Sequence, residues 1–176
     1  MKQNLFLWQF VGVTVSVALG TLLHFIFEWT SLTIFAPISA VNESTWEHMK
    51  ILFFPMLFFA LAQYFFFKVE FLGFWWVKLI GTIVGVLSIP IFFYTFNGAF
   101  GKTPDWLNII FFFLSALLGY LVEYHLFYVD FSPKFQFIGF IILILIASAF
   151  ILFTFYTPRL PLFKDPLTGL YGMVNI

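Results

Sequence analysis

The sequence predicts an all-α membrane protein built as a bundle of five transmembrane helices. Hydrophobic residues make up 62% of the 176 residues and charged residues only 9%, against roughly 25% charged residues in an average soluble domain. The mean hydropathy is +1.04. Because polar side chains are too few to cover a surface that faces water, a soluble fold is excluded and the lipid bilayer is the predicted partner.

Five apolar segments are long enough to cross the bilayer, which takes about 20 residues for ~30 Å of hydrocarbon. Backbone polar groups must be satisfied inside the lipid, which favours helices. None of the segments alternates apolar and polar residues as strands do. The predicted helices cover about 5–29, 46–67, 71–96, 106–129 and 135–156, within a single domain over residues 1–176.

The first segment follows Lys2 and has the layout of a signal peptide, but its apolar run is too long and no small-residue cleavage site follows it. We therefore expect an uncleaved first span. Five spans place the termini on opposite sides of the membrane, here called the N side and the C side. Lys2 precedes the first helix and no further Lys or Arg occurs before Lys50, which favours a cytoplasmic N-terminus.

The polar breaks agree with this number of spans. Lys68 and Glu70 separate the second helix from the third, Asn97 and Gly98 begin the break after the third, and Pro133 lies before the fifth. Charged and helix-breaking residues are costly inside a span and are expected between spans.

Two segments outside the predicted helices are too apolar to be solvated loops. Residues 30–41 are too short to span, which predicts a short re-entrant or interfacial segment after the first helix. In the tail, residues 157–176, three prolines exclude a sixth helix, although apolar residues dominate. We expect an ordered non-helical C-terminal tail that folds back over the C side.

The first helix carries small residues four positions apart, Gly12, Ser16 and Gly20, and the same ridge continues to His24 and Glu28. Small residues at this spacing mark close helix contacts. Polar and charged residues within a membrane usually face the bundle interior. His24 and Glu28 are therefore expected to point inward near the C side.

The densest polar stretch runs over residues 42–50, Asn-Glu-Ser-Thr-Trp-Glu-His-Met-Lys. Ser44 and Glu47 match a capping box, which predicts the start of the second helix. Capping does not account for His48, which lies one turn inside that helix. Since consecutive helices usually pack together, His48 is expected to meet His24 beneath the C side.

Two imidazoles with several carboxylates form a reasonable ligand set for Zn²⁺ or a similar divalent metal. We assign as candidate metal ligands His24, Glu28 and His48, and as candidate catalytic carboxylates Glu43 and Glu47, one of which would act as general base. Candidate substrate-binding residues at the same level are Asn42, Asn97, Asp105 and Arg159. The residues leave three interpretations open: a metal site, a metal-free polar binding pocket and a purely structural network.

Two further charges lie inside predicted helices near the N side. At 1.5 Å per residue, Lys78 and Glu123 each lie some 9–11 Å deep, beside ridges of small residues. An unpaired charge at this depth is costly. The sequence therefore predicts a structural ion pair between Lys78 and Glu123.

The string Asn-Glu-Ser-x-Trp-Glu-His-x-Lys at residues 42–50 resembles the signature of an uncharacterised family, a domain of unknown function, of small bacterial integral membrane proteins. The tail at residues 160–172 is similar to the C-terminal segment of that family. The resemblance implies a multi-pass protein of the bacterial plasma membrane with this number of spans. It implies no activity.

Several classes of function are excluded by composition. A formal net charge of zero provides no basic surface for nucleic acid, and the absence of cysteine removes thiolate ligands and nucleophiles. What remains is a hydrolase or transferase that uses a divalent metal on a lipid-like substrate, a metal-free membrane subunit that binds or transports a small hydrophobic molecule or an ion, or a non-catalytic partner in a membrane complex.

Overall fold

The computed structural model describes residues 4–67, 73–102, 104–132 and 135–173. Five long helices dominate it: α1 (Leu5–Thr30), α2 (Thr45–Phe67), α3 (Phe74–Phe100), α4 (Asp105–Leu126) and α5 (Gln136–Phe155). Each is long and apolar enough to cross a membrane. No strand occurs in the described residues. The predicted all-α class with five spans is therefore confirmed.

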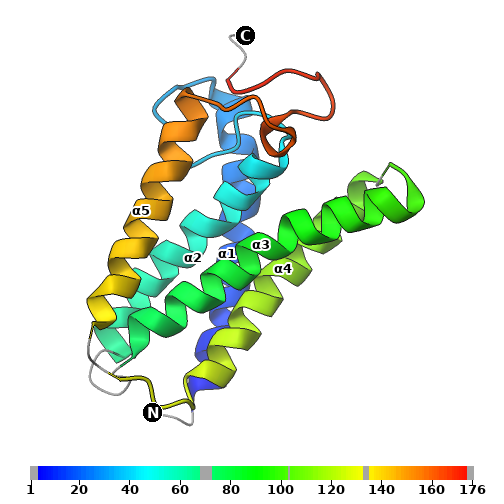
Figure 1. The fold of residues 1–176 in the computed structure, drawn as a ribbon. Helices are drawn as coiled ribbons and strands as arrows, with labels where there is room; N and C mark the ends of the chain where they lie inside the picture. Colours follow the sequence, from blue (N-terminus) through cyan, green and yellow to red (C-terminus); the bar gives the residue numbers. More distant parts are fainter. Residues whose placement is uncertain (1–3, 68–72, 103, 133–134, 174–176) are drawn as a thin grey trace.

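The helices form a bundle in which α3 and α4 make an oblique hairpin (Figure 1). α1 begins at the lower end of the view, and the tail lies over the upper end. The upper part of the hairpin leans away from α1 and α2, whereas its lower part stays close to them. α2 is the central helix, because 67% of its span is buried, against 28–39% for the other four.

Small residues allow the closest helix contact, which joins α3 to α4. A Cβ atom added to Gly119 would lie 2.9 Å from the carbonyl oxygen of Gly81, and one added to Gly85 would lie 3.1 Å from the carbonyl oxygen of Ser115. The two ridges of small residues therefore face each other. On α1, Gly20 is equally confined, since its added Cβ would lie 2.9 Å from the carbonyl oxygen of Ile51.

One predicted break differs from the structure. Asn97 and Gly98 lie inside α3, which continues to Phe100 and ends at Gly101. Gly101 has φ 86° and its backbone N–H donates to the carbonyl of Asn97. Glycine adopts positive φ at little cost, so Gly101 is the residue that ends the helix. The break residues 68–70 and 133–134 lie outside the described residues.

The two non-helical segments meet above the C-side end of the bundle. Residues 31–44 form a series of turns, fixed to α1 by a hydrogen bond from the Ala40 N–H to the carbonyl of Leu23. The tail contains a short 3-10 turn, η2 (Pro161–Phe163), and an isolated bridge between Lys164 and Tyr171. Phe163 is buried with its ring centroid 4.6 Å from that of Trp46. The tail is therefore packed on the helix ends.

Candidate metal centre

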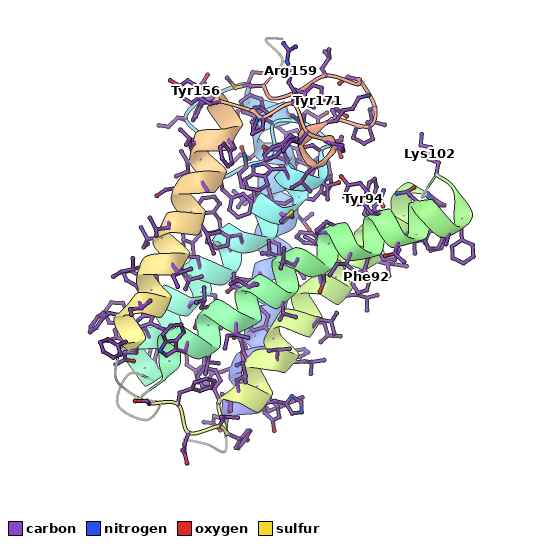
Figure 2. All side chains as sticks on the ribbon, in the orientation of Figure 1. Phe92, Tyr94, Lys102, Tyr156, Arg159 and Tyr171 are labelled. Carbon is purple, nitrogen blue, oxygen red and sulfur yellow. The ribbon has the colours of Figure 1, made fainter. Side chains whose placement is uncertain are left out.

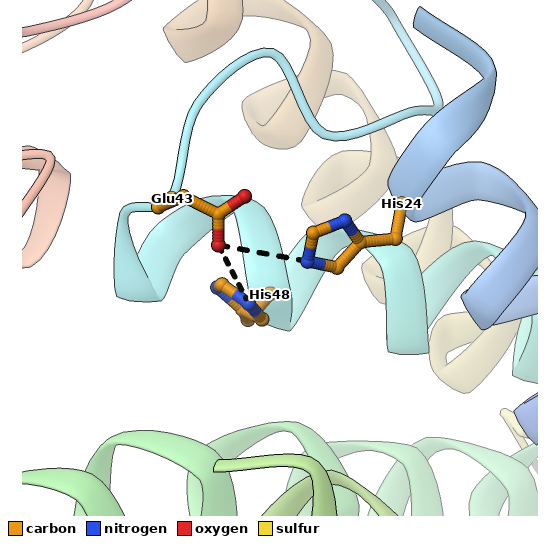
Figure 3. Close-up of side chains that lie close together, drawn as sticks. All are labelled: His24, Glu43 and His48. Carbon is orange, nitrogen blue, oxygen red and sulfur yellow. Dashed lines mark ion pairs between the residues drawn. The ribbon is translucent and has the colours of Figure 1, made fainter. Parts of the chain in front are cut away.

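Three side chains from three segments converge near the C-side end of the bundle: His24 of α1, Glu43 of the 31–44 segment and His48 of α2 (Figure 3). The Nε2 atom of each imidazole lies 3.6 Å from the same carboxylate oxygen, Oε2 of Glu43. The two ring centroids are 5.2 Å apart. One potential ligand atom from each residue lies within 4.8 Å of the other two.

Local hydrogen bonds place Glu43 immediately before α2. The Asn42 side chain accepts from the Ser44 N–H at 2.9 Å and donates to the carbonyl of Gly172 in the tail at 2.9 Å. The Ser44 hydroxyl in turn accepts from the Glu47 N–H at 3.4 Å, which is half of the predicted capping box. These bonds fix the turn that directs the Glu43 carboxylate toward α1.

The hydrogen bond of His48 suits metal binding. Its Nδ1 lies 3.0 Å from the carbonyl oxygen of Ser44. A carbonyl only accepts, so Nδ1 carries a proton, and in the neutral ring Nε2 then presents a lone pair toward Glu43. Metal-binding histidines commonly donate their second ring N–H to a backbone carbonyl in this way. His24 has no such partner, since its Nδ1 is buried without a hydrogen bond in the described part of the chain.

The distances also fit a tetrahedral metal ion. Bonds of about 2.0–2.1 Å in a tetrahedral Zn²⁺ site separate neighbouring ligand atoms by about 3.3–3.4 Å. The two imidazole–carboxylate separations are 3.6 Å, close to this value, and all three ligand atoms lie within 4.8 Å of one another. Three protein ligands would leave a fourth position for water or substrate, as in catalytic zinc sites.

The electrostatics favour an ionised Glu43. Direct polar contact with the His24 imidazole holds the pKa of Glu43 below its usual range, and attraction to His48 adds to this effect. Together these interactions outweigh partial burial, which alone would raise the pKa. The carboxylate is therefore in the form that a metal ligand requires.

The three residues line a cavity of about 410 Å³ that lies between α1 and α2 on one side and the α3–α4 hairpin on the other. Its walls are largely apolar and include Ile51, Ile89, Phe93 and Phe112, and the tail contributes Leu167. The cavity thus joins a polar cluster to an apolar volume within the membrane-spanning part of the bundle.

The other candidate ligand and catalytic residues lie outside this cluster. Glu28 is exposed near the end of α1, and the set that the geometry brings together contains Glu43 in its place. Glu47 is 2% exposed, lies 2.5 Å from the ammonium of Lys50 and accepts a hydrogen bond from the Val41 N–H. Its carboxylate therefore has structural partners and does not line the cavity.

Most candidate substrate-binding residues are also separate from the cavity. Asn97 donates from its side chain to the carbonyl of Phe93. Arg159 is exposed, and Figure 2 places it above the bundle in the tail. Asp105 is the first residue of α4, and its side chain lies outside the described part of the structure. Asn42 acts through the turn that it stabilises.

Two polar residues that the sequence pattern did not single out as site residues lie in this half of the bundle. Lys50 is fully buried and donates to the carbonyl of Ala36 and to the Thr154 hydroxyl, in addition to its ion pair with Glu47. It thereby connects α2 to α5 and to the 31–44 segment. Asn108 lines the cavity from α4, and its Oδ1 is buried with no hydrogen-bond partner among the described residues. An amide inside an apolar span is the signal that marks it.

At the opposite end of the bundle, Lys78 of α3 and Glu123 of α4 form an ion pair in which Nζ and Oε2 are 2.5 Å apart. Both side chains are 1% exposed. The pair lies next to the small-residue contact, since an added Cβ at Gly81 would collide with the Glu123 side chain.

These features define a multi-pass α-helical membrane protein with a partly buried His/Glu cluster. The chain belongs to a family of unknown function, DUF6512, whose model matches residues 1–173. No curated protein and no solved structure matches the chain. Membership of an uncharacterised family is therefore confirmed, and it brings no activity with it.

Proposed function

We propose that this protein is a metal-dependent hydrolase or transferase that acts on a lipid-like substrate, with His24, Glu43 and His48 as the ligands of a divalent ion such as Zn²⁺. The observation that carries the proposal is the convergence of three suitable ligand atoms within 4.8 Å at a cavity inside a helix bundle. Glu43 replaces Glu28 in the ligand set on the basis of these distances.

The residues of the chain have distinct parts in this chemistry. When bound, a divalent ion would lower the pKa of water or polarise a substrate carbonyl. The Ser44 carbonyl orients the His48 ring, and the turn stabilised by Asn42 holds Glu43 in position. The largely apolar walls lower the local polarity below that of bulk water, which strengthens electrostatic interactions at the site.

The cavity favours a substrate with an apolar chain. Its lining comes mainly from four helices that are long and apolar enough to span a membrane and is largely apolar, which suits a lipid chain. Asn108 offers a buried acceptor that no described residue uses. We assign it to positioning a hydroxyl or amide N–H of the substrate.

A second candidate function is metal-free binding or transport of a small hydrophobic molecule or an ion. It is supported by the contact of the Glu43 carboxylate with the His24 imidazole, whose Nε2 lies 3.6 Å from Oε2 and can carry the proton that a carboxylate partner needs in the absence of an ion. For location, we propose a bacterial plasma membrane with the N-terminus in the cytoplasm, on the basis of the charge distribution around the first helix.

The deciding experiment is metal analysis of the protein purified in detergent, followed by assays with lipid esters. We expect about one divalent ion per chain, lost in a His24→Ala, His48→Ala double variant. His125→Ala is the matched control, because His125 lies exposed near the end of α4. Absence of stoichiometric metal from the wild type would reject the enzyme and favour metal-free binding.

A further inference from the structure

The cavity beside the candidate metal centre is closed at its inner end. Each of four helices contributes a lining residue there: Gly20 of α1, Ile51 of α2, Ile89 of α3 and Phe112 of α4. A Cβ atom added to Gly20 would lie 2.6 Å from the Phe112 ring and 2.9 Å from the carbonyl oxygen of Ile51. Gly20 lies ten residues before the end of α1 at Thr30, so this floor is about 15 Å below the helix end at 1.5 Å per residue.

Polarity changes along the cavity. Because Gly20 meets Phe112 and the two helices are antiparallel, His24 and Asn108, each one turn nearer the C side, lie at the same outer level. The polar lining residues thus gather at the outer end, whereas the inner end is apolar. A lipid of the C-side leaflet has the same arrangement, with its headgroup at the surface and its chains toward the middle of the bilayer.

The edge of the cavity between α1 and α4 is exposed. Phe25 of α1 and Ile109 and Phe113 of α4 line the cavity and are 37%, 59% and 49% exposed. By contrast, Ile51 and Ile89 are 1% and 6% exposed. A lining residue that is also exposed lies at an opening, which agrees with the outward lean of the α3–α4 hairpin from α1 (Figure 1).

The character of this edge suits hydrocarbon rather than water. Its rim is apolar, and both α1 and α4 are long and apolar enough to cross a membrane. A second exposed edge occurs at the tail, where Leu167 lines the outer end of the cavity. The cavity therefore has one edge that faces the bilayer interior and one at the membrane surface.

We propose that a lipid of the C-side leaflet enters the cavity sideways between α1 and α4, with Phe25 and Ile109 at the rim. Its acyl chain occupies the apolar inner end, and its polar part reaches the candidate metal centre without the molecule turning over. The inference rests on the proposed function in one respect, that the cavity receives the lipid-like molecule. It adds the substrate class, a bilayer lipid, and the route of entry.

Photo-crosslinking tests the route. The probe is a phosphatidylcholine with a diazirine at the end of one acyl chain, in phosphatidylcholine nanodiscs, and labelled positions are read by mass spectrometry. The reporters are Ile51 and Ile89, which other side chains shield from the surrounding lipid. The matched controls are Leu52 and Leu143, which are each 0% exposed and do not line the cavity. We expect several-fold more labelling of the reporters than of the controls.

Two variants with equal added bulk distinguish the two edges. Ile109→Trp narrows the opening between α1 and α4 and should reduce reporter labelling several-fold, whereas Leu167→Trp at the tail should leave it unchanged. A reduction in Leu167→Trp equal to or larger than that in Ile109→Trp would overturn the proposal. Equal labelling of reporters and controls in the wild-type protein would also overturn it, whatever the variants do.

The labelling needs no metal, so its result is separate from that of the metal analysis. Reporter labelling in a protein without stoichiometric metal would retain the lipid route and reject the enzyme. Stoichiometric metal without reporter labelling would retain the metal centre and reject the lipid route.

Discussion

Removal of the Lys78 ammonium should destabilise the protein strongly. Lys78→Met keeps a long apolar side chain but leaves the Glu123 carboxylate 1% exposed without its cation. Breaking a buried ion pair from one side costs about 3–5 kcal/mol. At about 1.4 kcal/mol per factor of ten, the ratio of folded to unfolded protein should fall roughly 10²–10⁴-fold.

The loss comes from the uncompensated charge rather than from the pair itself, and this distinction gives the test. A Lys78→Met, Glu123→Gln double variant removes both charges, so it should recover much of the stability lost by the single variant. Reversible unfolding in mixed detergent micelles measures the free energy of unfolding. Lys102→Met is the matched control, because Lys102 is exposed beyond the end of α3, and it should change stability by less than about 0.5 kcal/mol.

Equal effects of Lys78→Met and Lys102→Met on the free energy of unfolding would contradict a stabilising role of the buried pair. Simple addition of the effects of Lys78→Met and Glu123→Gln in the double variant would also contradict it, because additive effects mean that the two side chains do not interact.

Three further predictions concern the metal site, the cavity and the α3–α4 contact. Glu43→Gln should weaken binding of Zn²⁺ at least about tenfold, since mutation of a residue that merely hydrogen-bonds to a metal ligand already has an effect of that size. Unchanged binding in a metal titration would remove Glu43 from the ligand set. Asn108→Leu should raise the KM for a lipid-like substrate without altering the metal content. The control Thr21→Val should alter neither the KM nor the metal content, because the Thr21 hydroxyl already donates to the Val17 carbonyl. An unchanged KM in Asn108→Leu would contradict the positioning role of Asn108. Gly81→Ala should lower the free energy of unfolding by about 1–3 kcal/mol through overpacking. Gly98→Ala has nothing within 4 Å of the added Cβ and should raise the free energy of unfolding by about 0.5–1 kcal/mol. Equal shifts in the two variants would contradict the close contact between α3 and α4.

The spans were predictable because hydropathy is a local property of the sequence. The ends of α1 and α2 fall within one residue of their expected positions, since lipid thickness sets the length of each apolar run. The end of α3 was less predictable. Asn97 and Gly98 favour a turn in water, but a long apolar helix continues through them until Gly101 adopts positive φ.

The composition of the polar cluster depends on contacts that sequence spacing does not reveal. Glu28 lies one turn from His24 on the same ridge, and spacing alone therefore favoured it as a ligand. In the structure α1 ends at Thr30, and Glu28 is exposed there. Glu43 reaches His24 because Asn42 is bonded to Gly172, 130 residues away. The sequence placed Glu43 in this cluster as a candidate catalytic carboxylate, but helical periodicity does not reveal that it, rather than Glu28, lies beside both imidazoles.

The two ends of the helix bundle differ in how far their polar side chains are enclosed, and the difference bears on function. At the N side, aromatic rings enclose the Lys78–Glu123 pair, and both partners are 1% exposed, so exchange with an outside ligand would require helices to separate. At the C side, His24 and His48 have side chains 24% and 23% exposed, and Glu43 39%, and all three line a cavity. A purely structural role requires only a buried pair such as Lys78–Glu123. Polar side chains that are partly exposed and line an apolar cavity are the arrangement expected where a ligand or substrate completes the site.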